Sequence, residues 1–163
     1  MNRPPAAPTP ADQQRLALLI EAEAIQLGEF VALLEREEAL LTSGDTDALL
    51  ALTQDKNERY RRLQRLSDDR ALLLGRLGRV SSDTTLRELL ADLPRVLARW
   101  DEVIGLARQA SERNAINGKL ILERMAHNQA ALSVLLAAAD QAPLYDADGH
   151  TRTVGGGRIL GSA

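Results

Sequence analysis

Few residues of this chain belong to the types that carry out chemistry. The sequence has two histidines, His127 and His150, and no cysteine, and the histidines lack the spacing of a zinc-binding helix. Residues 146–149 (Asp-Ala-Asp-Gly) match only the start of a calcium loop, so we expect a turn there. The glycines at 155–157 are not followed by the Lys-Ser/Thr pair of a phosphate-binding loop. We therefore expect no catalytic centre, metal or cofactor, and we expect His127 on a helix surface.

The charged residues exclude further classes of protein. The net charge is −3, and the densest basic cluster, Arg59, Arg61, Arg62 and Arg65, is spread around a helix among acidic neighbours. This pattern does not predict a nucleic-acid interface. No apolar run approaches the ~20 residues that span a bilayer, and the first ten residues lack the hydrophobic segment of a signal peptide. We expect a cytosolic protein without stable membrane insertion.

One unusual stretch lies between residues 112 and 121. Asn114, Asn117 and Gly118 occur within five residues, although asparagine and glycine are unfavourable inside helices. Their amides could fix the register of packed helices by hydrogen bonding. Alternatively, the helix could break at Asn-Gly, or this face could be left underpacked for the helix of a partner. The apolar period continues through Ile121 and Met125, which argues against a full break.

The elements that must position these residues are helices. Leucine and alanine supply about a third of the 163 residues, whereas only four residues are aromatic. Such a composition favours helix and argues against β-rich folds. Heptad-like stripes cover residues 11–41, 46–77 and 83–139. Because short loops join them, we predict an all-α fold: an elongated antiparallel bundle of three long helices with coiled-coil-like packing and disordered termini.

The ends of these segments carry recognisable signals. Thr9 or Asp12 can cap the first helix, Gly44 ends it, and Asp45 or Ser43 caps the second. Gly28 is unfavourable within the first helix, and a packing contact could explain it. Composition predicts three regions: a flexible Pro-rich leader at 1–10, a helical bundle domain at 11–139 and a flexible tail at 140–163.

Two features of the stripes allow more than one structure. Three seam positions of the second segment are cationic: Lys56, Arg59 and Arg70. They could extend into water at the edge of the core, or pair with glutamates of the acidic first segment, at Glu37, Glu38 or Glu23. In the third segment, Pro94 predicts either a short preceding helix or one long bent helix.

The chain resembles the FlgN family of flagellar export chaperones from about residue 14 to 150. The most specific part is Asn114-x-x-Asn117-Gly118-x-Leu120-Ile121, followed by Leu144-Tyr145-Asp146-x-x-Gly149. The resemblance implies a cytoplasmic, non-enzymatic chaperone of flagellum biogenesis and type III protein export. Such a protein holds the hook–filament junction proteins before secretion and delivers them to the export gate or export ATPase. It also implies that Tyr145 takes part in docking on the export machinery.

A candidate cargo surface follows from combining this resemblance with the apolar register. Disordered cargo termini could fold as an amphipathic helix against an exposed face of the third segment. Met125 is adaptable enough to accept more than one cargo. The same face could instead be ordinary core, and an alternative function is a self-associating coiled-coil or adaptor protein without export cargo. The candidate cargo-binding residues are Asn114, Asn117, Gly118, Ile121, Met125, Leu132 and Leu135.

Overall fold

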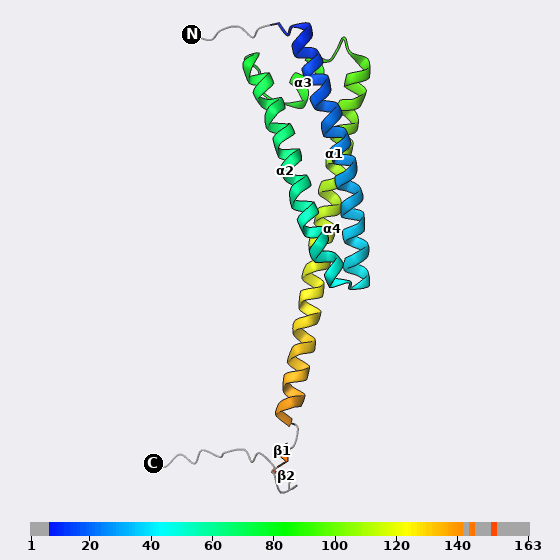
Figure 1. Ribbon diagram of the computed structural model, residues 1–163, viewed down its shortest axis with the longest axis vertical. Helices are drawn as coiled ribbons and strands as arrows, with labels where there is room; N and C mark the ends of the chain where they lie inside the picture. The colour runs from blue at the N-terminus through cyan, green and yellow to red at the C-terminus, as the bar shows by residue number, and fades with distance from the viewer. Residues whose placement is uncertain (1–6, 142–143, 146–150, 153–163) are drawn as a thin grey trace, which may run out of the picture. The chain divides into compact units, whose positions relative to one another are not determined.

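The sequence signals at the helix ends determine most of the observed elements. A computed structural model describes residues 7–141, 144–145 and 151–152, and the fold is all-α (Figure 1). These residues form four helices, α1 (Pro10–Ser43), α2 (Thr46–Arg76), α3 (Asp83–Leu89) and α4 (Pro94–Gln141). They are followed by two short strands, β1 (Leu144–Tyr145) and β2 (Thr151–Arg152).

The caps of α1 and α2 are those expected. Thr9 accepts a hydrogen bond from the Asp12 amide at 3.2 Å, and the Asp12 carboxylate accepts one from the Thr9 amide at 3.0 Å. Gly44 ends α1 in the left-handed conformation at φ 85°, which favours glycine. Asp45 caps α2 by accepting from the Ala48 amide at 3.0 Å. A two-residue connection therefore reverses the chain into an antiparallel hairpin.

The third apolar segment is two helices, one short and one long, so the described residues form four helices where three long ones were predicted. Pro94 is the first residue of α4, and α3 has already ended at Leu89. Proline lacks the amide that an interior position would donate, but it is well suited to the first turn of a helix. Of the two alternatives at Pro94, the short preceding helix is confirmed. Ser82 caps that helix by accepting from the Thr85 amide at 3.2 Å.

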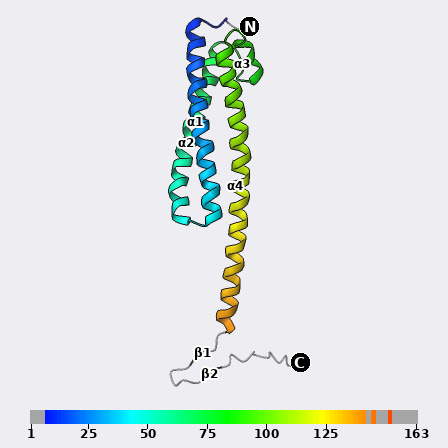
Figure 2. The same cartoon turned by 90° about the vertical axis from the view of Figure 1, so that its right-hand side faces the viewer.

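The chain divides into two compact units, Met1–Ile121 and Leu122–Ala163. In the first unit, α1, α2 and the first part of α4 lie side by side, with α2 antiparallel to the other two (Figures 1 and 2). The short helix α3 lies near the start of α4 (Figure 2). The described part of the chain contains no helix long and apolar enough to cross a bilayer.

The leucine stripe of α1 forms much of the core. Ile20 and Leu34 are fully buried, as the heptad pattern indicated. Burial of a Leu or Ile side chain contributes roughly 1.5–3 kcal/mol each, so this stripe largely determines how the other helices pack. The main cluster comprises Leu16, Ile20, Ala24, Leu73, Leu74, Leu86, Leu89, Leu90, Trp100 and Val103.

Pairing, rather than extension into water, accounts for the cationic seam of α2. Lys56 contacts Glu37 at 2.9 Å, and Arg70 contacts Glu23 at 3.1 Å. Arg59 pairs with Glu29, also on α1. Of the two alternatives for these cations, pairing with glutamates of the first segment is therefore the one observed.

Gly28 does not have the packing role expected of it. A β-carbon built at this position would meet nothing within 4 Å, and the same holds for Gly118. No close helix approach in the described residues therefore requires glycine at either position.

The predicted tail contains a small element of regular structure. Leu144 pairs with Arg152 and Tyr145 with Thr151 in an antiparallel register. The rest of residues 142–163, and residues 1–6 of the predicted leader, lie outside the described residues, so disorder of the termini stays a prediction.

Candidate functional site

Asn117 lies inside the bundle rather than on its surface. Its side chain is 1% exposed, and its Nδ2 donates to the Leu34 carbonyl at 2.9 Å and to Glu37 Oε2 at 2.7 Å. Glu37 also pairs with Lys56, so one carboxylate connects α1, α2 and α4. The first interpretation of the Asn/Gly stretch, register fixed by amide hydrogen bonds, therefore holds for Asn117.

Asn114 and Gly118 occupy different environments from Asn117. Asn114 is exposed at the edge of a groove, and Gly118 is half-buried. α4 runs from Pro94 to Gln141 without interruption, so the predicted alternative of a break at Asn-Gly is wrong. Of the candidate residues whose side chains the structure describes, Asn117 alone is buried.

The remaining candidates on α4 are exposed apolar residues. Ile121 is 39% exposed, Met125 62%, Leu132 55% and Leu135 67%. Their spacing continues the register of Trp100 and other buried residues of the same helix. The heptad pattern alone does not single out three further exposed apolar residues, Leu122, Val134 and Leu136, because they lie beside or opposite the seam.

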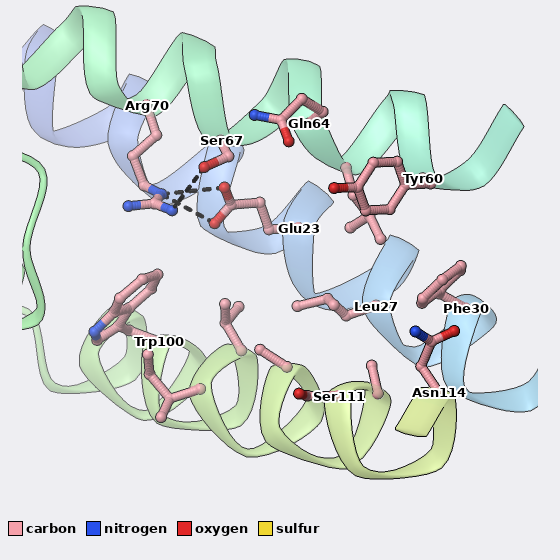
Figure 3. A pocket seen from close by; sticks show the side chains of 15 residues that line it. Glu23, Leu27, Phe30, Tyr60, Gln64, Ser67, Arg70, Trp100, Ser111 and Asn114 are labelled. Atoms are coloured by element: carbon pink, nitrogen blue, oxygen red, sulfur yellow. Dashed lines mark hydrogen bonds and ion pairs between the residues drawn. The ribbon is translucent and has the colours of Figure 1, made fainter. Parts of the chain in front are cut away.

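An apolar groove lies between α2 and α4 in the first unit, with α1 as its floor (Figure 3). Its volume is about 460 Å³. The sequence signal for it is the dilution of the α4 seam by small and polar residues, of which Ala107, Ser111 and Asn114 line the groove. The lining residues are Glu23, Leu27, Phe30, Tyr60, Leu63, Gln64, Ser67, Arg70, Trp100, Val103, Ile104, Ala107, Ala110, Ser111 and Asn114.

One end of this groove is a polar cluster around Trp100. Arg70 contacts Glu23, donates to Ser81 Oγ at 2.9 Å and lies 4.8 Å from the centre of the Trp100 ring. Trp100 Nε1 donates to Asp83 at 2.7 Å. Burial raises the pKa of Glu23, although Arg70 opposes this shift. The hydrogen bond from Trp100, together with Arg87, lowers the pKa of Asp83.

The described residues provide an apolar groove and an exposed apolar seam as candidate binding surfaces. Among these residues, no group of three or more His, Asp or Glu side chains could hold a metal ion. His127 is exposed on α4, as expected. His150 and the turn expected at 146–149 lie outside the described residues, and only the backbone of Tyr145 is described, in β1.

Comparisons with known proteins place this helical chain in a family. The model of the FlgN protein family matches residues 12–153. A flagella synthesis protein FlgN of Yersinia enterocolitica is 26% identical over 153 residues, covering 88% of this chain and 97% of the relative. A second, from serotype O:8 / biotype 1B, is 25% identical and covers 91% and 95%. No solved structure matches the chain. The chain therefore belongs to the FlgN family, and membership implies the role of a chaperone in flagellar synthesis.

Proposed function

We propose that this protein is a cytoplasmic type III export chaperone for the hook–filament junction proteins. It binds their C-terminal segments, prevents premature association and delivers them to the export gate or export ATPase. The observation that carries the proposal is the exposed apolar seam of α4, at Ile121, Met125, Leu132 and Leu135. Exposed apolar patches of this kind typically mark protein interaction sites.

The mode of binding follows from the chemistry of this surface. A cargo segment that is disordered alone can fold as an amphipathic helix and bury its apolar face against the seam. Ordering the cargo offsets part of the free energy gained, so a moderate and reversible affinity is expected. That affinity suits a carrier which must release its cargo.

The buried state of Asn117 narrows the proposed surface. Its amide is hydrogen-bonded to α1, so we leave Asn117 outside the cargo surface and give it the role of orienting α4. Asn114 and Gly118 stand at the bundle end of the proposed surface. Contact with cargo then depends chiefly on the four apolar residues.

The experiment replaces two seam residues by charged ones. In an Ile121→Asp/Met125→Asp variant, two carboxylates face the cargo, and we expect the affinity for a junction-protein C-terminal segment to fall about 100-fold or more. Titration calorimetry measures the affinity, and circular dichroism checks that helicity is retained. The matched control is Ala126→Asp/Ala130→Asp, which introduces the same side chains on the opposite side of α4.

A second variant, measured against two partners, tests the role of Tyr145. We expect Tyr145→Ala to bind the segment normally but to dock more weakly on the purified export-gate component. Equal loss of both activities would contradict this division of roles. Normal cargo binding by the seam variant would show that the cargo surface lies elsewhere.

A further inference from the structure

The open side of the bundle is the α2–α4 groove. The ion pairs that join two long helices, such as Lys56–Glu37, Arg70–Glu23 and Arg99–Glu21, have one partner in α1. Between α2 and α4 the contact that closes one end is Arg70 over Trp100. Toward the other end of the groove, Ser111 and Asn114 of α4 face Tyr60 and Phe30 (Figure 3). The α2–α4 side is therefore the side on which the three long helices leave an apolar groove open to a further helix.

The charge and length of this groove define what can occupy it. Its only charged lining residues, Glu23 and Arg70, neutralise each other. From Trp100 to Asn114 the groove follows α4 for about 21 Å, at 1.5 Å per residue. The matching occupant is an uncharged apolar helix of about four turns.

The chain itself carries such a helix at residues 125–139. These residues include no Asp, Glu, Lys or Arg, although charged residues make up 26% of the chain. Their side chains are exposed, and large apolar ones occur on opposite sides of α4, at Leu132 and Val134. The Ser133 hydroxyl donates to the Gln129 carbonyl at 3.1 Å. Because this hydroxyl has a partner within its own helix, it can be buried without losing its hydrogen bond. His127, Asn128 and Gln129 make the start of the segment polar, whereas residues 130–139 are apolar on most sides, as is usual for a buried helix.

We propose that residues 125–139 of one molecule occupy the α2–α4 groove of a second copy of this chain. The segment is about 22 Å long, which matches the groove, and neither surface presents an unpaired charge. Each copy has one groove and one segment, so a two-fold symmetric exchange fills both grooves and closes the assembly as a dimer.

This exchange has a consequence that rests on the proposed function. The residues that fill the groove include Met125, Leu132 and Leu135, which are also proposed to bind cargo. Self-association and cargo binding then exclude one another. The free chaperone protects its apolar helix in the dimer, and cargo converts the dimer into a chaperone–cargo complex.

Complementation between two variants tests the exchange. Ala107→Glu places a charge in the groove, and Leu135→Asp places one on the inserted helix; both positions are exposed in the single copy. We expect sedimentation to show each variant alone dimerising about 10-fold or more weakly than the native chain. In an equimolar mixture, the heterodimer retains one intact groove and one intact helix, so its association should exceed that of either variant. Ala115→Glu, on the same helix outside the groove, is the matched control and should dimerise normally.

Three results would overturn the exchange. The first is a native chain that stays monomeric at high concentration, and the second is a mixture no tighter than its components. The third is loss of association in Leu135→Asp but not in Ala107→Glu, which indicates that the 125–139 segments of two copies pair with each other outside the groove. None of these results bears on cargo binding, which the Ile121→Asp/Met125→Asp variant tests separately.

Discussion

Single polar residues fix how the three long helices meet. Glu37 receives hydrogen bonds from Asn117 on α4 and from Lys56 on α2, and it is itself buried. A buried carboxylate is stable only when it is paired and hydrogen-bonded. Because Glu37 must keep both partners, its hydrogen bonds restrict the axial positions of α1, α2 and α4 relative to one another.

The sequence could indicate these groups only in part. An Asn/Gly cluster within an apolar period predicts a specific role, and the acidic and basic stripes predict pairing. Which asparagine turns inward depends on the rotation of α4 about its axis, which leucine packing far from residue 117 decides. The choice between paired and solvent-extended cations depends on whether a glutamate lies opposite each one. Both are properties of the assembled bundle.

At the residue scale, Asp83 should confer a pH-dependent stability. Hydrogen bonds from Trp100 and Arg87 hold the pKa of Asp83 below its ordinary value. The folded pKa is thus lower than the unfolded one, so the stabilisation is complete at neutral pH and is lost as the pH falls below about 4. We expect Asp83→Asn to unfold at lower urea concentration than the native chain at pH 7, with the difference shrinking toward pH 3.

Trp100 is the only tryptophan and supplies the fluorescence signal for these unfolding curves. Asp92→Asn removes an exposed carboxylate between α3 and α4 and controls for the change of net charge. A difference for Asp83→Asn that is the same at pH 7 and pH 3 would mean that its hydrogen bonds, and not its charge, stabilise the fold.

At the scale of elements, local sequence signals determined where the helices begin and end, whereas the number of helices depended on long-range packing. Thr9, Gly44 and Asp45 act within one or two turns, so the sequence located the ends of α1 and α2 within a few residues. The seven-residue spacing of apolar residues on either side of Pro94 indicates which face is apolar. It does not indicate whether the helix is continuous through Pro94. One predicted segment could therefore be two helices in the same register.

The glycine within α1 and the glycine that ends it should respond oppositely to substitution by alanine. Gly28 is helical and has free space around its Cα, so Gly28→Ala should raise the free energy of unfolding by ~0.5–1 kcal/mol. Gly44 has φ 85°, so Gly44→Ala forces a left-handed alanine and should lower that free energy by ~1–2 kcal/mol. Urea unfolding of both variants provides the comparison. Destabilisation by Gly28→Ala would reveal a packing constraint on α1 absent from the isolated chain, such as a bound partner or second copy.

At the scale of the whole molecule, the sequence indicates the small and polar residues of the α4 seam, but it does not predict the groove that they line. The groove exists because α1 contacts both α2 and α4, whereas small side chains on α4 leave space opposite α2. The apolar register also cannot distinguish core from interface. Trp100 and Leu135 share one seam, and one is buried while the other is exposed.

This division of one seam predicts uneven local stability along α4. Residues 125–139 have exposed side chains, so their helix depends on local hydrogen bonds alone, which are marginal for a helix of this length. Amides around Asn117 lie in the packed bundle and open only with a larger unit. In dilute protein, hydrogen exchange at 125–139 should be faster by about three orders of magnitude. Raising the protein concentration, or adding a junction-protein segment, should slow exchange at 125–139 while leaving the bundle unchanged. Equal protection of both regions in the dilute chain would mean that 125–139 is already packed within one molecule, which would remove the basis for a partner on this surface.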